Sequence, residues 1–432
     1  MDANYNPNSM IKKPPYVFVI VSIIGFAIFA FSNHDNISKG SSLKDLQYVS
    51  QKILAKDIFQ LYIDSISDEL LKRDKLQLKI KSLEEVNDDI KAAVEKLSKE
   101  KDALKGLAKK TVIESRGNIS GLPKDSVDYY LKIYNDKKTT FSKELDSLSN
   151  PLITELNQII DEGSAKEIND LTKQKDSIQN IIDKYKTKLA GIVKTYEGSK
   201  AIKFKGMEFD IFITNTDSNE ISMHLKSPGK GKNYSNIIGL LNSEVLKGRK
   251  VLMITNAGMY TSSHEPEGLF IENRRPINEL DKKIIPNTDL NFYMKPNGVY
   301  FIDTAEVNYI SKTEDFEGYV KKNKINVKYA TQSGPMLVIG GEIHDKFKVG
   351  SPNLNIRSGV GIISDKKTVF IISKTETNFY DFGVLFKEVF NCKNALYLDG
   401  AISLMYINDI APNERGGNFG PMISVVKKEK NK

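Results

Sequence analysis

Two runs of apolar residues, spaced alternately four and three apart, constrain what residues 42–198 can form. The first run occupies residues 76–104 and the second occupies residues 168–196. This spacing is a heptad seam, which buries one face of a helix against another helix. Between the runs, residues 116–125 (RGNISGLPKD) contain glycines and a proline that do not continue a helix. We therefore predict a coiled-coil spacer over residues 42–198, with a break near its middle.

Two arrangements satisfy these seams. The segments on either side of the break are nearly equal in length, which favours an antiparallel hairpin within one chain. A parallel coiled coil between two chains is the alternative and would make the protein a homo-oligomer. Asn87 and Lys101 occupy seam positions and would fix the register in either arrangement. Asn150-Pro151 has the pattern of a helix N-cap followed by proline, so we expect a further helix to start there.

The amino terminus carries an uncharged apolar run at residues 16–32 (YVFVIVSIIGFAIFAFS), preceded by Lys12-Lys13. Its length is at the short end of what spans a bilayer as a helix. Lysines before the run keep residues 1–15 cytoplasmic and send the rest of the chain across the membrane. A cleaved signal peptide, with small residues at 30–32, is the alternative. We predict a single-pass membrane anchor, with the C-terminal domain outside the cytoplasm, periplasmic or extracellular.

Composition argues against several classes of protein. Lys and Arg total 63 against 55 for Asp and Glu, and this mild excess forms no arginine-rich tract, so nucleic-acid binding is not expected. Cys392 is the only cysteine, which rules out an intramolecular disulfide, and four histidines make a multi-histidine zinc site improbable. We predict no cofactor and leave a divalent cation open.

From residue 201 the helical period gives way to short β-branched and aromatic runs bounded by turn residues. Ten runs are strand candidates: FDIFIT, VLMIT, GLFIE, NFYMK, GVYFI, GPMLVIG, GVGIIS, TVFIIS, ALYLD and MISVV. One amphipathic helix is expected at residues 379–390. We predict an α+β chain, in which a helical coiled-coil region precedes a C-terminal domain of mixed β-sheets with flanking helices at residues 201–428.

Polar residues and glycines recur where these predicted strands begin or end. In NALYLDGAISLMY (residues 394–406) an apolar strand ends on Asp399 and Gly400, and Ser403 follows. The others at such positions are Asn256, Gly258, Glu267, Gln332, Ser333, Arg357, Glu376 and Asn378. Each alone has a structural explanation, such as a turn glycine or a helix N-cap. Together they match the way scaffolds place catalytic groups on loops, and they predict one site.

Seven ordered blocks carry a resemblance to a known family: NAGMY, EPEGLFIE, FYMKPNGVYFI, ATQSGPMLVIGGEIH, IRSGVGI, TNFYDFGVLFKE and CKNALYLDGAIS. They closely resemble the bacterial branch of the phosphodiester glycosidase family. That family shares its domain with the lysosomal uncovering enzyme, an N-acetylglucosamine-1-phosphodiester alpha-N-acetylglucosaminidase. The resemblance covers residues 201–428 and implies a hydrolase that cleaves a sugar from a phosphodiester-linked glycan. Many members have a glycine run and a serine after the Asp-Gly, whereas this chain has Ala401-Ile402-Ser403.

This chemistry needs a carboxylate, because the reaction passes through an oxocarbenium-like transition state. The carboxylate stabilises or attacks the anomeric carbon, or it activates a water molecule that does so. We expect Asp399 to supply it, with Glu267 second and Glu376 third. A phosphate-ester leaving group needs little protonation, so a cationic clamp matters more than a strong acid, and the planar fork of Arg357 suits that role. The predicted substrate-binding set is completed by Asn256, Gly258, Gln332, Ser333, Asn378, Gly400 and Ser403.

Two other functions fit the same residues. One is a non-catalytic glycan-binding or scaffold module of the cell envelope, carried on a coiled-coil rod. The other is a phosphodiesterase that breaks the P–O bond and not the C–O bond. Expected partners are a glycan or sugar-phosphate substrate and, through the N-terminal helix, the membrane.

Overall fold

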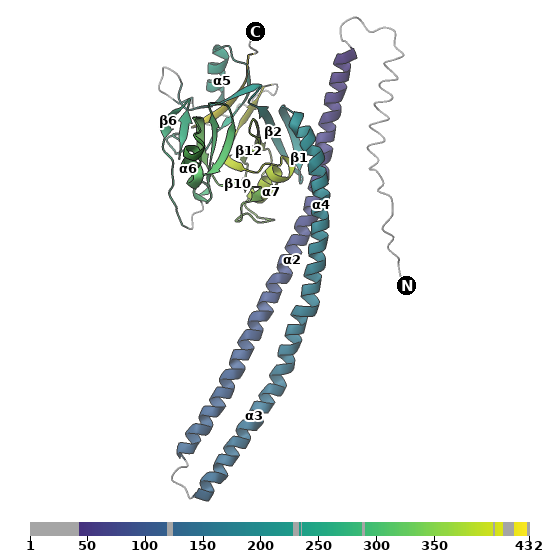
Figure 1. The fold of residues 1–432 in the computed structure, drawn as a ribbon, viewed down its shortest axis with the longest axis vertical. Helices are drawn as coiled ribbons and strands as arrows, with labels where there is room; N and C mark the ends of the chain where they lie inside the picture. Colours follow the sequence, from purple (N-terminus) through teal and green to yellow (C-terminus); the bar gives the residue numbers. More distant parts are fainter. Residues whose placement is uncertain are drawn as a thin grey trace, which may run out of the picture. The chain divides into compact units, whose positions relative to one another are not determined.

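The structure is a computed structural model that describes residues 43–118, 124–227, 233–234, 236–286, 290–400, 402–408 and 419–429 (Figure 1). The chain divides into two units, Met1–Asp57 and Ile58–Lys432. The predicted anchor at residues 16–32 lies outside the described residues. Within the described ranges, none of the helices combines the length and the apolar character that spanning a bilayer requires.

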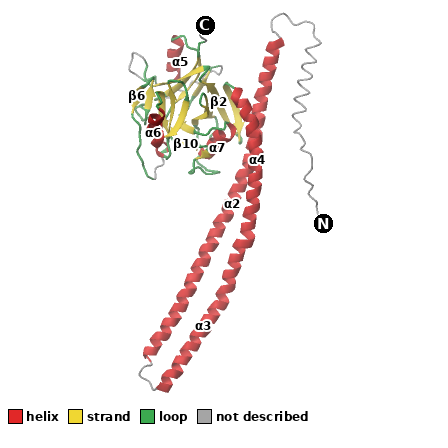
Figure 2. Cartoon of the chain, in the orientation of Figure 1, coloured by secondary structure: helices red, strands yellow, loops and turns green. Residues whose placement is uncertain are grey.

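Long helices come first in the described chain (Figure 2). They are α2 (Leu43–Asn118), α3 (Lys124–Gln158), the π-helical turn η1 (Ile159–Ser164) and α4 (Ala165–Thr195). The second unit takes in α2 from Ile58 onward and all of the helices after it. Two hydrogen bonds between the arms fix their relative direction. Lys175 donates to Gln77 of α2, and Lys105, farther along α2, accordingly binds an earlier residue of the second arm, Asp146. The helices therefore form an antiparallel hairpin within one chain.

The predicted break is confirmed, since α2 ends at Asn118 and α3 begins at Lys124. Seam residues Ile80 and Ile182 are buried, whereas Leu104, nearer the break, is 44% exposed. The expected helix start at Asn150-Pro151 is wrong, because Pro151 lies inside α3. Pairing across the hairpin accounts for this continuity: Lys101 of α2 binds the side chains of Asn150 and Asp146, one helical turn apart.

Three β-sheets follow the hairpin in the described residues. The seven-stranded sheet has the order β1-β2-β13-β12-β14-β10-β11. Its strands are β1 (Gly198–Phe204), β2 (Met207–Asn215), β10 (Met336–Ile339), β11 (Glu342–Ile343), β12 (Ser358–Ser364), β13 (Lys367–Ser373) and β14 (Ala395–Asp399).

The other two sheets have the orders β6-β5-β9-β7-β8 and β15-β4-β16-β3. The five-stranded sheet contains β5 (Phe270–Glu272), β6 (Arg275–Asn278), β7 (Gly298–Asp303), β8 (Asn308–Lys312) and β9 (Val327–Ser333). The four-stranded sheet contains β3 (Asn219–His224), β4 (Val251–Asn256), β15 (Met405–Ile407) and β16 (Met422–Lys427). Helical segments are α5 (Ile237–Leu246), the 3-10 turn η2 (Asn291–Tyr293), α6 (Thr313–Asn323), and α7 (Phe379–Val384), which continues into the π-helical η3 (Leu385–Val389).

The α+β class is confirmed, and the predicted helix at residues 379–390 corresponds to α7 and η3. Strand pairings in the described parts of the chain are antiparallel throughout, where the sequence led us to expect mixed sheets. The strand predicted at NFYMK is wrong. Its residues turn back on themselves, since the backbone N–H groups of Tyr293 and Met294 donate to the carbonyls of Leu290 and Asn291.

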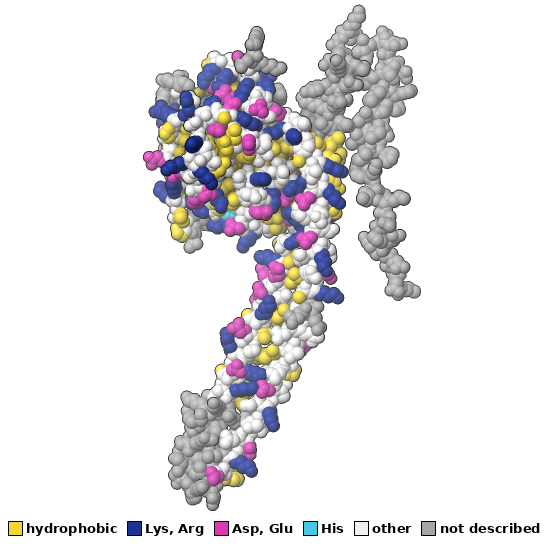
Figure 3. Space-filling view, in the orientation of Figure 1, with side chains coloured by type: hydrophobic (Ala, Val, Ile, Leu, Met, Phe, Trp, Pro, Cys, Tyr) yellow, Lys and Arg dark blue, Asp and Glu magenta, His cyan; other side chains and the backbone are white. Residues whose placement is uncertain are grey.

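The first turns of the hairpin in the second unit share a hydrophobic core with the seven-stranded sheet. Phe59, Ile63 and Leu70 of α2 and Leu189 of α4 are fully buried in this core. Strand residues of β1, β2 and β13 and the inner faces of α7 and η3 complete it. Farther out, basic and acidic side chains alternate over the hairpin surface, as the face in Figure 3 shows. The base of the hairpin is thus part of the globular domain.

A buried ionic cluster joins the hairpin to α7. The Lys205 ammonium lies 2.5 Å from an oxygen of Asp74 on α2 and 2.6 Å from one of Asp381 on α7. Only 4% of the Lys205 side chain is exposed. Removing one member of such a cluster leaves uncompensated charge in a poorly solvated place.

We expect Lys205→Met to lower the free energy of unfolding by about 3 kcal/mol, because the buried Asp74 and the partly buried Asp381 lose their shared cation. Urea denaturation of the purified protein measures this. Lys203→Met is the matched control, since Lys203 is 70% exposed and its pairing with Glu208 is at the surface. Equal, small losses in both variants would contradict the assignment.

Candidate active site

The site is organised around the end of β14. This strand lies between β12 and β10, and its residues up to Leu398 are buried. Its last residue, Asp399, pairs with Ser358 at a point where the register with β12 shifts. One carboxylate oxygen of Asp399 accepts a hydrogen bond of 2.7 Å from the backbone N–H of Gly400. The predicted arrangement, an apolar strand that ends on an acid, is therefore confirmed.

Asp399 opens into a pocket of about 340 Å³ that Glu267 also lines. The remaining lining comes from the loop after β4, from η2 and its preceding residue, and from the end of β14 and the residues after it. These residues are Met259, Tyr260, Leu290, Asn291, Phe292, Tyr293, Tyr397, Gly400 and Ile402. The pocket thus presents two carboxylates among aromatic rings, an arrangement able to hold a sugar and act on its anomeric carbon.

Burial shapes the electrostatics of Asp399. It raises the pKa of this carboxyl to about 6, because the charged form loses water; the Gly400 N–H bond opposes the shift without cancelling it. Burial, with the nearby Asp399 charge, also raises the pKa of Tyr260 to about 12. The pKa of Tyr397 is raised as well, chiefly by burial. Both phenols are therefore uncharged near pH 7.

Glu267 lies beside a phenol. The Tyr293 hydroxyl lies 3.3 Å from Oε1 of Glu267 and 3.1 Å from Oδ2 of Asp281. Burial raises the pKa of Tyr293 to about 12, and the two carboxylates add to the shift. The phenol therefore keeps its one proton, and Glu267 and Asp281 share this single donor, with Asp281 the nearer acceptor.

Asn256 and Ser403 form a buried polar network beside the strand end. The Ser358 and Ser403 hydroxyls are 2.8 Å apart, and Asn256 Nδ2 lies 3.3 Å from Ser358 Oγ. The Ser403 N–H donates to the Gly400 carbonyl at 2.8 Å. Neither predicted ligand lines the pocket; both lie among the chain's own polar groups and hold the turn that carries Asp399 and Gly400.

Gly400 does line the pocket, and close packing explains the glycine. A Cβ atom at this position would lie 2.7 Å from the Tyr397 hydroxyl, which leaves no room for a larger residue. Gly258 is similarly constrained, since a Cβ atom there would lie 2.2 Å from the Gln332 carbonyl oxygen. These two glycines let backbone and ring approach closely around the site.

Gln332 and Ser333, at the end of β9, are buried away from the pocket. Oε1 of Gln332 accepts from the N–H groups of Leu269 and Asp281, both at 2.9 Å, and its Nε2 donates to the Asp281 carbonyl at 2.6 Å. Ser333 Oγ donates to the Leu398 carbonyl at 2.9 Å. The chain itself uses these groups, and they tie β9 to β14 and to the loop that carries Glu267.

Arg357, predicted as the phosphate clamp, is 1% exposed and does not line the pocket. Its Nε donates to the Thr377 carbonyl at 2.7 Å, and one terminal nitrogen lies 3.0 Å from both the carbonyl and the side-chain oxygen of Asn353. The guanidinium stacks 3.6 Å above the Phe379 ring and 5.7 Å from the centre of the Tyr397 ring. Arg357 thus lies directly behind the wall of the pocket.

The last two predicted residues lie apart from the pocket lining. Glu376 is exposed on the loop before α7. Asn378 caps α7: its Oδ1 accepts from the Asp381 N–H at 2.8 Å, and its Nδ2 donates to the Asp381 carboxylate at 2.8 Å. The structure therefore brings together Asp399, Glu267 and Gly400 in one pocket, with Asn256, Ser403 and Arg357 behind it.

Sequence reasoning missed the aromatic members of the site, Tyr260, Phe292, Tyr293 and Tyr397. ALYLD and NFYMK are both strand candidates in the sequence, and that pattern does not mark their aromatic residues as parts of a site. The available signal was that Tyr397 lies two residues before Asp399 in YLDG and that Tyr260 lies two residues after Gly258 in NAGMY.

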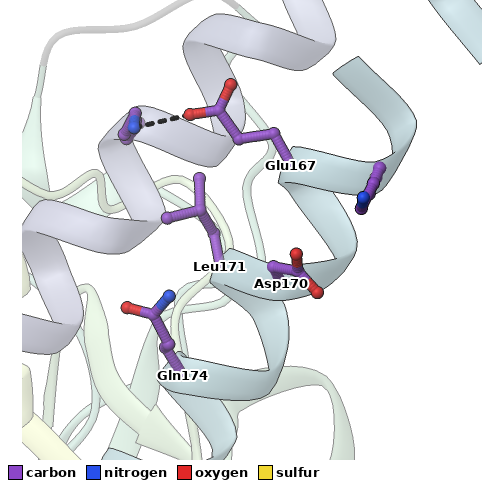
Figure 4. A pocket seen from close by; sticks show the side chains of 6 residues that line it. Glu167, Asp170, Leu171 and Gln174 are labelled. Carbon is purple, nitrogen blue, oxygen red and sulfur yellow. Dashed lines mark ion pairs between the residues drawn. The ribbon is translucent and has the colours of Figure 1, made fainter. Parts of the chain in front are cut away.

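Other candidate sites in the described residues are weaker. No group of three or more His, Cys, Asp or Glu side chains placed to bind a metal occurs within them. Figure 4 shows a second hollow, between α2 and α4, where Lys79 and Glu167 pair at 2.6 Å. Both of these side chains are about half exposed, so this hollow is a solvated gap between helices.

Comparison with known proteins agrees with the class that this carboxylate pocket defines, a glycosidase-type hydrolase. The family model for phosphodiester glycosidases matches residues 249–421. The uncharacterized protein YigE of Escherichia coli (strain K12) is 32% identical over 217 residues, which cover 50% of this chain and 81% of YigE. The chain belongs to the phosphodiester glycosidase family.

Among solved structures, the chain is similar to the zebrafish N-acetylglucosamine-1-phosphodiester alpha-N-acetylglucosaminidase catalytic domain, auto-inhibited by its pro-peptide. The TM-score is 0.36 at 14% identity, and the match covers 54% of this chain and 82% of the zebrafish chain.

The partly buried Asp399, with its raised pKa, predicts a pH-dependent stability difference. Its folded-state pKa of about 6 lies above the value of 3.8 for an unperturbed aspartate, so between these values the folded protein binds more protons than the unfolded chain. Stability from this group therefore falls as pH rises through this window. We expect Asp399→Asn to be more stable than wild type at pH 7, by roughly 3 kcal/mol at most.

At pH 4 that difference should shrink towards zero, because wild-type Asp399 is then protonated when folded. Melting temperatures of both proteins across pH 4 to 7.5 measure it. An asparagine variant less stable than wild type at pH 7 would show instead that Asp399 acts as a turn cap.

Proposed function

We propose that this chain is a membrane-anchored, exported hydrolase that cleaves a sugar from a phosphodiester-linked glycan, with Asp399 as the working carboxylate. The observation that carries the proposal is the place of Asp399: a strand-end acid, raised in pKa to about 6, that lines an aromatic pocket together with Glu267. Membership of the phosphodiester glycosidase family supports the same reaction class.

At pH 7 a carboxyl of this pKa is about nine-tenths ionised. The ionised form is the one that stabilises or attacks an anomeric carbon carrying positive charge, or activates a water beside it. Poor solvation of Asp399 strengthens that interaction, because its charge is weakly screened inside the pocket. The phosphate ester leaves as a stable anion, so no strong general acid is required.

We assign roles to the other residues of the site from their positions in or behind the pocket lining. Glu267, which shares the Tyr293 hydroxyl with Asp281, is the second carboxylate in contact with substrate. The rings of Phe292, Tyr293, Tyr260 and Tyr397 provide apolar faces for the sugar. Asn256 and Ser403 keep the Asp399 turn in place, and Glu376 takes no part. No cofactor is assigned.

We also propose that residues 16–32 anchor the chain. The uncharged run and the lysines before it support this proposal. The hairpin does not supply the spacer expected from the sequence, because its two arms begin and end in the same hydrophobic core, at Phe59 and Leu189, and so add no distance between the segments before and after them. Self-association is proposed only through outer faces of the hairpin, because its seam residues pack within one chain.

Topology has a direct test. A reporter enzyme that works only outside the cytoplasm is fused after Lys432. It should be active, because the lysines before the apolar run keep the amino terminus inside and place the carboxyl terminus outside. Exchanging Lys12 and Lys13 for glutamates is the matched control and should reduce export. A parent fusion whose reporter is inactive would exclude this localisation.

Turnover in oxygen-18 water tests the reaction itself, with a sugar-1-phosphodiester as substrate. Label in the released sugar is expected and indicates C–O cleavage. Label in the phosphate would indicate a P–O phosphodiesterase, and no turnover would indicate a binding module. Asp399→Asn should lower kcat by at least about a hundredfold, or ~2.7 kcal/mol, because it removes the charge that stabilises the transition state.

Two further variants serve as controls for Asp399. Glu376→Gln changes an exposed acid outside the pocket and should keep wild-type turnover. Glu267→Gln should reduce turnover less than Asp399→Asn does. If Asp399→Asn keeps its activity while Glu267→Gln loses it, the catalytic assignment moves to Glu267.

A further inference from the structure

A second pocket, of about 370 Å³, adjoins the candidate active site. Most of its lining belongs to the loop between β11 and β12, and the rest comes from α7 and from the residue after η2. The lining residues are Met294, Lys346, Phe347, Lys348, Val349, Gly350, Ser351, Pro352, Asn353, Phe379 and Tyr380.

The two pockets share a wall. Phe379 of the second pocket packs edge-on against Tyr397 of the first, with ring centres 4.9 Å apart. Met294 of the second follows directly after Tyr293 of the first. Because a single oxygen atom joins the phosphorus of a sugar phosphodiester to the anomeric carbon, such a substrate reaches both pockets only around an edge of this wall.

The two pockets differ in charge. The first contains Asp399 and Glu267 and, among the described residues that line it, no lysine or arginine. The second contains Lys346 and Lys348 and no acid among its lining residues. Both lysines are exposed, and neither ammonium pairs with a described carboxylate. The neighbouring Asp345 side chain is 90% exposed and lies 3.0 Å from His344 Nδ1.

The loop that carries the lysines is built on buried contacts. Nε2 of His344, a residue with 1% exposure, lies 3.1 Å from the Lys295 carbonyl, and the Phe347 ring stacks between His344 at 4.7 Å and Phe379 at 4.9 Å. At its far end, Asn353 binds the Arg357 guanidinium. Arg357 therefore connects the lysine loop to the Phe379–Tyr397 wall.

We propose that this second pocket is the leaving-group subsite, where Lys346 and Lys348 bind the phosphate ester of a substrate whose sugar occupies the Asp399 pocket. A phosphodiester carries a negative charge, which the two carboxylates of the first pocket repel and the two lysines attract. Arg357 is then a positioning residue that holds the loop through Asn353. The assignment of phosphate and sugar sides rests on the proposed function.

The test compares two substrates in the full-length protein. For Lys346→Gln/Lys348→Gln, kcat/KM on a sugar-1-phosphodiester should fall about tenfold or more, the size expected for lost charge-assisted contacts. On the nitrophenyl glycoside of the same sugar, which has no phosphate, kcat/KM should stay within about twofold. The matched control, Lys321→Gln/Lys322→Gln, removes two exposed lysines from the last turn of α6 and should leave both substrates unaffected.

Arg357→Lys keeps the charge and loses the planar fork, so as a positioning residue it should also affect the phosphodiester more than the nitrophenyl substrate. Adding Lys346→Gln/Lys348→Gln to it should then cause little further loss, because both changes act on one contact. Equal losses on the two substrates in the lysine variant, or no loss on either, would overturn the subsite.

A binding measurement separates this inference from the proposed function. If wild type hydrolyses neither substrate, the proposed function fails, and calorimetric titration with glycerol 3-phosphate still decides the subsite. Binding that Lys346→Gln/Lys348→Gln abolishes and Lys321→Gln/Lys322→Gln preserves supports it. Binding unaffected by the lysine pair, or absent in wild type, contradicts it.

Discussion

Burial of a carboxylate at the end of β14 is the constraint around which this domain is arranged. Asp399 loses hydration where the strand emerges, which raises its pKa to about 6. A carboxylate in that environment costs stability at neutral pH, a cost expected at functional sites and rare elsewhere. The surrounding polar network of Asn256, Ser358 and Ser403 holds the turn in place without neutralising the charge.

The wall behind Asp399 extends this arrangement towards α7 and the hairpin. Tyr397 packs against Phe379, Phe379 carries the Arg357 guanidinium on its face, and Asp381 of the same helix shares Lys205 with Asp74 of α2. The hairpin base is therefore structurally continuous with the site through buried side chains. Its fully buried Phe59 and Leu189 belong to the same hydrophobic core.

Much of the fold was predictable because local pattern determines it. Heptad spacing identified the two arms of the hairpin, and β-branched runs such as TVFIIS and ALYLD became β13 and β14. The strand-end acid was predictable for the same reason. NFYMK shows the limit: its composition favours a strand, but hydrogen bonds back to Leu290 and Asn291 make it a 3-10 turn.

The roles of the polar residues were less predictable, since they depend on partners distant in sequence. Gln332 is satisfied by Leu269 and Asp281, and Arg357 by Thr377 and Asn353, and no spacing rule identifies those partners. A buried arginine and an exposed one look alike in a sequence. Tyr293 entered the site only because the chain turns where a strand was expected.

The pH dependence of kcat/KM on a sugar-1-phosphodiester tests the central claim, an ionised Asp399 at work, most directly. The free-enzyme profile should reach half of its plateau near pH 6, the pKa of Asp399, fall further at lower pH, and level off above about pH 7. The low-pH limb should remain in Glu267→Gln. A profile with no limb near pH 6, or one that falls as pH rises above 6, would contradict an ionised Asp399 as the catalytic carboxylate.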